Sequence, residues 1–79
     1  MNREDDRALE AYVSRMTQAE RYDSYCVLLE DMQGQNSEDD IRLAYFLGQI
    51  YLPDCLSDIV RLIGKYMDVP YERVLKIVK

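Results

Sequence analysis

The chain has 79 residues, a formal net charge of −5 and no histidine. A chain of this length is predicted to form one domain that buries roughly 60–65% of its unfolded surface, so its stability margin is small and a homodimer is allowed. Seven tyrosines and 48% hydrophobic residues exclude an intrinsically disordered chain, because disorder requires low hydrophobicity and few aromatic side chains.

Residues 3–16 are predicted to form the first helix. Glu4, Asp5 and Asp6 would lie near the positive end of its dipole, where acids are stabilising. One apolar stripe follows at the i, i+3, i+4 and i+7 positions of a helix, namely Leu9, Tyr12, Val13 and Met16.

A break is predicted near Thr17. Thr17 and Glu20 have the spacing of a capping box, in which each side chain accepts a hydrogen bond from the other residue's backbone N–H. The alternative is a single helix of about thirty residues over 3–33, because apolar residues continue through this region at a spacing close to a heptad.

The second helix is predicted to end at Gly34, since glycine suits the left-handed conformation that often follows a helix. Its apolar stripe consists of Tyr22, Tyr25, Cys26, Leu29 and Met32. A polar loop, 35–37, comes next, and Ser37 is expected to cap the following helix.

The most apolar run of the chain is Ile41–Leu52. It is predicted to lie in a central helix, Ser37–Tyr51, with apolar side chains nearly all round. One complete stripe comprises Leu43, Phe46, Leu47 and Ile50, and a second side carries Ile41, Ala44, Tyr45 and Leu52. A helix of this kind is normally enclosed by others. Gly48 would weaken it by about 1 kcal/mol unless a neighbouring helix crosses closely there, and Pro53 should end it.

The remaining sequence predicts two short helices. The first begins near Asp54, continues through Gly64 and has an apolar stripe of Leu56, Ile59, Val60, Ile63 and Met67. Asp68 is predicted to cap the last helix, with Pro70 in its first turn. That helix should extend to Lys79 with Tyr71, Val74, Leu75 and Val78 facing inward. The predicted fold is therefore an all-α, single-domain bundle of four to five short helices.

Cys26 and Cys55 are predicted to be reduced, buried thiols, because free cysteine is among the most buried residue types. Their wide separation and the absence of histidine disfavour a zinc site, and no cofactor is expected. Neither a signal peptide nor an apolar run of about 20 residues is visible. A cytoplasmic protein without membrane association is therefore expected.

Charge is distributed unevenly along the chain. Residues 1–40 hold eleven acids and four arginines, a net charge of −7, whereas residues 41–79 hold four acids and six bases, a net charge of +2. The sequence also lacks a nucleophile motif, a glycine-rich phosphate loop and a histidine for general-base catalysis. We therefore expect a protein that is not an enzyme.

The first functional hypothesis is a small acidic regulatory or inhibitory protein that acts by binding a partner protein. Tyrosine is enriched at interfaces because its ring is apolar and its hydroxyl is hydrated. Clustered acids beside exposed tyrosines would suit a basic partner, such as a protein that handles nucleic acid, and the small size is typical of phage or mobile-element regulators. The residues expected to bind this partner are Tyr22, Asp23, Glu30, Asp31, Glu38, Asp39 and Asp40.

The alternative hypothesis is a DNA-binding transcriptional regulator with a helix-turn-helix at residues 54–79. The available bases are Arg61, Lys65, Arg73, Lys76 and Lys79. Nucleic acid is the less favoured partner, because the net charge is negative and Glu72 would lie on the recognition helix.

Overall fold

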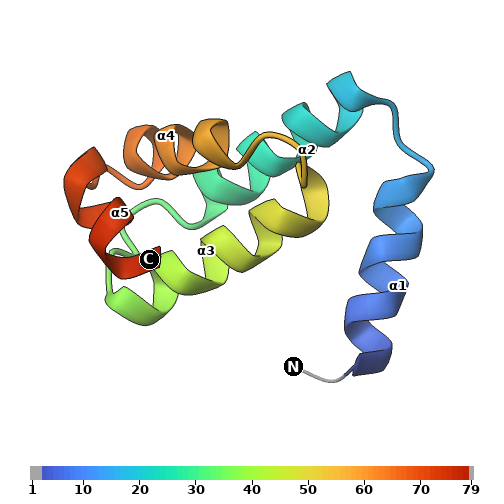
Figure 1. Ribbon diagram of the computed structural model, residues 1–79, viewed down its shortest axis with the longest axis horizontal. Helices are drawn as coiled ribbons and strands as arrows, with labels where there is room; N and C mark the ends of the chain where they lie inside the picture. The colour runs from blue at the N-terminus through green and yellow to red at the C-terminus, as the bar shows by residue number, and fades with distance from the viewer. Residues whose placement is uncertain (1–2, 79) are drawn as a thin grey trace.

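The computed structural model describes the backbone of residues 3–78 and the side chains of residues 7–78. These residues form five α-helices and no strand: α1 (Arg3–Ser14), α2 (Gln18–Asp31), α3 (Glu38–Tyr51), α4 (Leu56–Tyr66) and α5 (Tyr71–Val78) (Figure 1). The predicted small all-α bundle is confirmed.

The first two helices are separated at Thr17, where the capping box is complete. The Thr17 hydroxyl accepts a hydrogen bond from the Glu20 N–H at 3.2 Å, and the Thr17 N–H donates to Glu20 Oε1 at 3.1 Å. The hydrogen bonds from the Thr17 backbone and hydroxyl hold the pKa of Glu20 below its ordinary value. The alternative of one long helix is therefore wrong.

The start of α3 also follows the prediction. Ser37 Oγ accepts a hydrogen bond from the Asp40 N–H at 3.2 Å and caps the helix. Gly34 has a φ of 90°, so the turn after α2 uses the left-handed conformation that glycine tolerates. At the other end, α3 stops at Tyr51 and Leu52 is its C-cap, directly before Pro53.

Helix α3 lies at the centre of the bundle, because it packs against each of the other four helices. Its inward face is made by Ile41, Ala44, Gly48 and Tyr51, all of which are buried. The predicted burial of α3 on nearly all sides is wrong on the opposite face. Leu43 and Phe46 are exposed there by 41% and 37%, and Leu47 and Ile50 are only half-buried.

Close packing at Gly48 explains which face turns inward. A Cβ atom at Gly48 would lie 2.5 Å from Ile59 Cγ2 on α4 and 2.8 Å from Tyr25 Oη on α2. The Tyr25 hydroxyl donates a hydrogen bond of 2.7 Å to the carbonyl oxygen of Ala44, one turn earlier on α3. Two helices thus approach the α3 backbone at its smallest side chains, and the predicted close crossing is confirmed.

Several side chains that were assigned to inward stripes lie outside the core. Those predicted inward but found exposed are Tyr12, Tyr22, Leu56 and Tyr71. Leu56 and Tyr71 are the first residues of α4 and α5, where the neighbouring helices give less cover. Cys26 and Cys55 are free thiols, but they are half-buried rather than buried.

The corner between α4 and α5 differs from the predicted cap. Asp68 has a φ of 56° and follows Met67, the C-cap of α4, so it occupies the left-handed position that ends α4. The Val69 N–H donates back to the carbonyl oxygen of Gly64 at 3.1 Å, which closes this turn. The start of α5 is capped instead by the carbonyl oxygen of Pro70, which accepts from the Arg73 and Val74 N–H groups.

Helix α1 stands to one side of the other four helices and packs on α3 (Figure 1). It is anchored by Val13, which is only 2% exposed and whose carbonyl oxygen accepts a hydrogen bond from Arg21 Nε at 3.1 Å. None of the helices in the described part of the chain is long and apolar enough to cross a membrane.

Candidate partner-binding surface

The predicted acids at the start of α3 are exposed or half-buried, and their charges have partners within the same helix. Asp40 Oδ2 accepts a hydrogen bond of 2.7 Å from the Ser37 hydroxyl. Arg42 forms ion pairs with Glu38 and Asp39 at N–O distances of 3.6 and 3.8 Å. Because such exposed pairs contribute little free energy, they can be exchanged for contacts with a partner.

The other predicted residues lie on α2. Tyr22 and Glu30 are near Tyr66 of α4, on the seam between the two helices. The pKa of Tyr66 is raised, mainly by the Cys26 thiol beside it and less by burial, Glu30 and Tyr22. The same ring has the ammonium group of Lys65 at 5.6 Å from its centroid.

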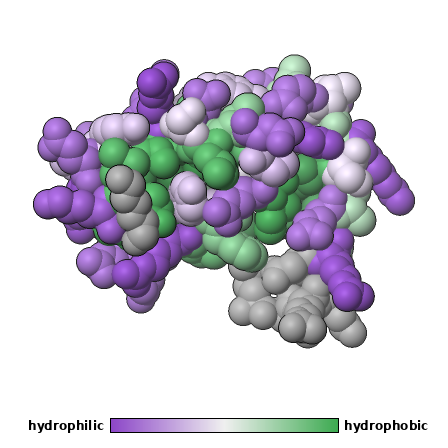
Figure 2. Space-filling view, in the orientation of Figure 1, coloured by the Kyte–Doolittle hydropathy of each residue, from purple (hydrophilic) through white to green (hydrophobic). Residues whose placement is uncertain are grey.

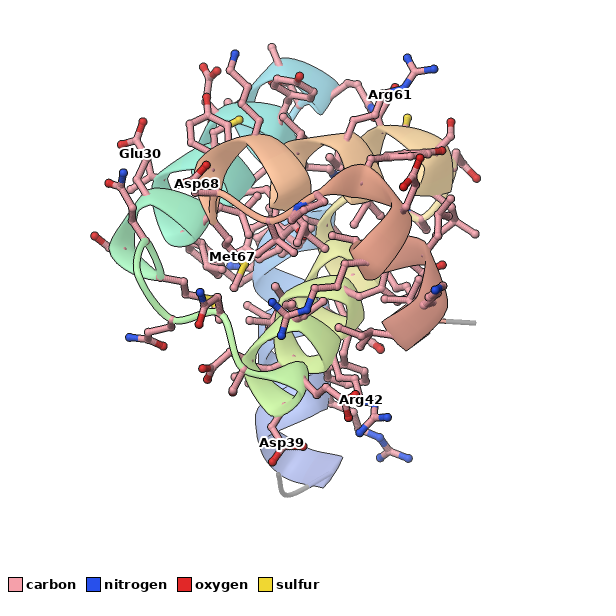
Figure 3. All side chains as sticks on the ribbon, turned by 90° about the vertical axis from the view of Figure 1, so that its left-hand side faces the viewer. Glu30, Asp39, Arg42, Arg61, Met67 and Asp68 are labelled. Atoms are coloured by element: carbon pink, nitrogen blue, oxygen red, sulfur yellow. The ribbon has the colours of Figure 1, made fainter. Side chains whose placement is uncertain are left out.

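The two acidic sets do not form one surface. In Figure 3, Glu30 lies at the upper left of the molecule and Asp39 at its lower end. Asp23 and Asp31 are exposed on α2, with Glu30. The residues predicted to bind one partner are therefore divided between the α2 side and the start of α3.

The basic side chains of the DNA-binding hypothesis do not all have the same surroundings. Arg61, Lys65 and Lys76 are exposed on α4 and α5. Arg73 Nη2 donates a hydrogen bond of 3.3 Å to the carbonyl oxygen of Asn36, so it helps to hold the loop before α3. Lys79 lies outside the described residues.

The surface that sequence reasoning missed is the outward side of α3. We call Leu43, Phe46, Leu47 and Ile50 the outer face of α3. The sequence predicts this stripe from its helical spacing but places it in the core. Figure 2 shows green apolar surface in separate areas at the left and to the right of centre, with polar side chains between and around them. Contiguous apolar surface rimmed by polar groups is typical of interaction sites.

A cleft of about 390 Å³ opens beside the outer face, between α1 and α3. Its lining residues are Glu10, Phe46, Gln49, Ile50 and Pro53. No sequence pattern predicts this cleft, because its position depends on where α1 docks on α3. Binding sites of this kind are concave and mostly apolar, with a few polar groups that add specificity.

Both helices that form this cleft carry acids, although α2, with four acids and one arginine, is the most acidic helix at a formal charge of −3. Helix α1 holds four acids and two arginines, and α3 holds three acids and one arginine, so each has a formal charge of −2. Helices α4 and α5 each have a formal charge of +1. The cleft itself is lined by one acid, Glu10, and the acids of α3 lie at the start of that helix.

Within the described residues, no three cysteine, aspartate or glutamate side chains are grouped so that they could hold a metal ion. Comparisons with protein-family models, with curated proteins and with solved structures give no match to this chain.

Proposed function

We propose that this chain is a non-catalytic regulatory or inhibitory protein that acts by binding another protein through the outer face of α3 and the adjoining cleft. The observation that carries the proposal is the exposure of Leu43 and Phe46 on α3, the helix that contains most of the apolar run Ile41–Leu52. A 79-residue domain has little apolar area to spare for stability, so large apolar side chains left at the surface point to a binding role.

The residue types of this surface also suit a protein partner. Aromatic side chains are enriched in interface cores, and Phe46 lines a cleft that can receive a side chain. Tyr12 of α1 is 62% exposed, and its hydroxyl contributes to the raised pKa of Tyr51 on α3 after burial. Tyr12 is thus an exposed aromatic side chain on α1, the helix that forms the other wall of the cleft.

The test is affinity capture from the native host with the tagged protein and with a double variant, Leu43→Gln with Phe46→Gln. Glutamine keeps helix propensity while removing the apolar surface. We expect the wild type to enrich a specific protein and the double variant to lose it. Circular dichroism of both proteins would establish that each is folded.

Two further variants separate this surface from the acids predicted from sequence. Asp23→Lys with Glu30→Lys tests the α2 side, and Glu38→Lys with Asp39→Lys tests the start of α3 while leaving the Asp40 cap in place. If the α2 variant alone loses the partner, the binding site is on α2 and the proposed surface is wrong. A wild-type bait that enriches nothing specific would contradict a protein-binding function altogether.

DNA binding through α4 and α5 is the second candidate. The structure does contain the required helix pair, joined by residues 67–70, and each helix has a formal charge of +1. A DNA binder would give a gel shift that weakens steeply with salt and is reduced by Arg61→Ala with Lys65→Ala. No shift at low salt would remove this candidate.

A further inference from the structure

We infer that the occupant of the α1–α3 cleft is an amphipathic helix of another protein, with large apolar side chains on one side and lysines or arginines around them. This inference rests on the proposed function and specifies its partner. The apolar stripe, the cleft and the acids Glu10 and Asp39 on its two walls each contribute one part of it.

The shape of the surface favours a helix. The outer face of α3 spans eight residues from Leu43 to Ile50, about 10 Å along the helix axis at a rise of 1.5 Å per residue. Its members have the i, i+3, i+4 and i+7 spacing with which one helix packs on another. The cleft beside Phe46 and Ile50 then receives an anchor side chain of the incoming helix.

Charge selects a basic partner. Glu10 lines the cleft on the α1 side. Asp39 lies one turn before Leu43 and two turns before Phe46 on the same side of α3, so it is near the opposite end of the stripe. Lysines or arginines beside the apolar anchors would therefore meet acids at both ends, which speeds association and fixes the register.

The same charges disfavour the other occupants. A second copy docked through this surface would bring Glu10 and the acids at the start of α3 from both copies to one interface. Like charges that face each other across an interface oppose association. Nucleic acid would meet the same repulsion at these walls.

The first experiment uses synthetic peptides with a fluorescent label and measures anisotropy as the protein is titrated. The probe is an 18-residue helical peptide with leucines at i, i+3, i+4 and i+7 and lysines at the remaining positions. One control peptide has glutamate in place of every lysine. A second control has the same composition in an order that breaks the apolar stripe.

We expect the leucine–lysine peptide to bind at least tenfold more tightly than either control. Phe46→Gln should weaken this binding about tenfold or more, as for a central aromatic anchor. Glu10→Lys should weaken it several-fold and reduce its dependence on salt. The matched control is Val27→Gln on α2, an exposed apolar residue outside the surface, which should leave the affinity within about twofold.

Equal binding of the scrambled peptide would overturn the inference, because attraction would then be charge alone. Equal affinity of the wild type, Phe46→Gln and Glu10→Lys would overturn it as well. Light scattering that shows a dimer lost on Phe46→Gln would identify a second copy as the occupant. Capture of a partner that depends on Leu43 and Phe46 but contacts them with an acidic or non-helical segment would leave the proposed function standing and remove only this inference.

Discussion

The two faces of α3 are both apolar, but they differ in the size of their side chains. The inward face includes Ala44 and Gly48, whereas the outer face has only Leu, Phe and Ile. Small residues let Tyr25 and Ile59 approach the α3 backbone, so the less bulky face is the one that packs. Fit to neighbouring helices, rather than hydrophobicity, decides which side is buried. The bulkier face is left partly exposed.

Gly48→Ala is the substitution expected to break this arrangement most severely. In an open helix the change would stabilise by about 1 kcal/mol. Here the new methyl group would meet Ile59 Cγ2 and Tyr25 Oη, both closer than carbon and oxygen atoms normally approach. We expect a net loss of about 2 kcal/mol in the free energy of unfolding, typical of overpacking. Urea denaturation followed by circular dichroism measures it.

The control for this substitution is Gln49→Ala, at the neighbouring exposed position. Surface changes of this kind usually stay within about 0.5 kcal/mol. If Gly48→Ala proved as harmless as Gln49→Ala, the close crossing of α2 and α4 on α3 would be disproved.

High pH tests the inward face through its tyrosines. Burial raises the pKa of Tyr25 well above its ordinary value, and burial with the nearby Tyr12 raises the pKa of Tyr51. The unfolded chain therefore loses these protons first, near pH 10. Their contribution to stability is complete below pH 10 and is lost as pH rises through the folded-state pKa values.

The denaturation midpoint, measured at pH 8, 10 and 11, should thus be lower at pH 11 than at pH 10. In Tyr25→Phe the fall should be smaller, because one of the two buried phenols is gone. An unchanged profile in that variant would show that Tyr25 is not the group responsible.

At pH 7, Tyr25→Phe should reduce the free energy of unfolding by about 1 kcal/mol, the usual net worth of one hydrogen bond. The bond that it removes joins Tyr25 Oη to the Ala44 carbonyl oxygen across two helices. Tyr22→Phe on the exposed side of α2 is the matched control and should change little. Equal losses in the two variants would mean that the buried bond contributes nothing specific.

The helix boundaries could be predicted because each depends on a few adjacent residues. Thr17 with Glu20 and Ser37 with Asp40 act locally and cap α2 and α3 as predicted, whereas α2 ends at Asp31, before Gly34, which takes the left-handed conformation in the turn that follows. Asp68 was misassigned because aspartate serves both as an N-cap and, less often, as a left-handed residue after a helix. Only Val69 separates Asp68 from Pro70, so Asp68 can end α4 or cap α5 but cannot do both.

The candidate surface could not be predicted, because its position depends on contacts between distant elements. Apolar residues surround α3, so periodicity alone does not say which side faces inward. A close crossing at Gly48 requires that this side of α3 faces the core. The separation of Glu30 from Asp39 likewise depends on the direction of the loop after α2.

Phe46→Gln should have the smallest effect on stability and the largest effect on binding. Phe46 is 37% exposed and borders the cleft, so its removal leaves no enclosed cavity. We expect the free energy of unfolding to fall by less than about 1 kcal/mol, compared with about 3–5 kcal/mol for an aromatic residue removed from a core. Urea denaturation of Phe46→Gln beside Tyr51→Ala, which truncates a buried ring of the inward face, measures the contrast. A loss as large as that of Tyr51→Ala would mean that Phe46 is a core residue, and the outer face of α3 would then have no apolar anchor to offer a partner.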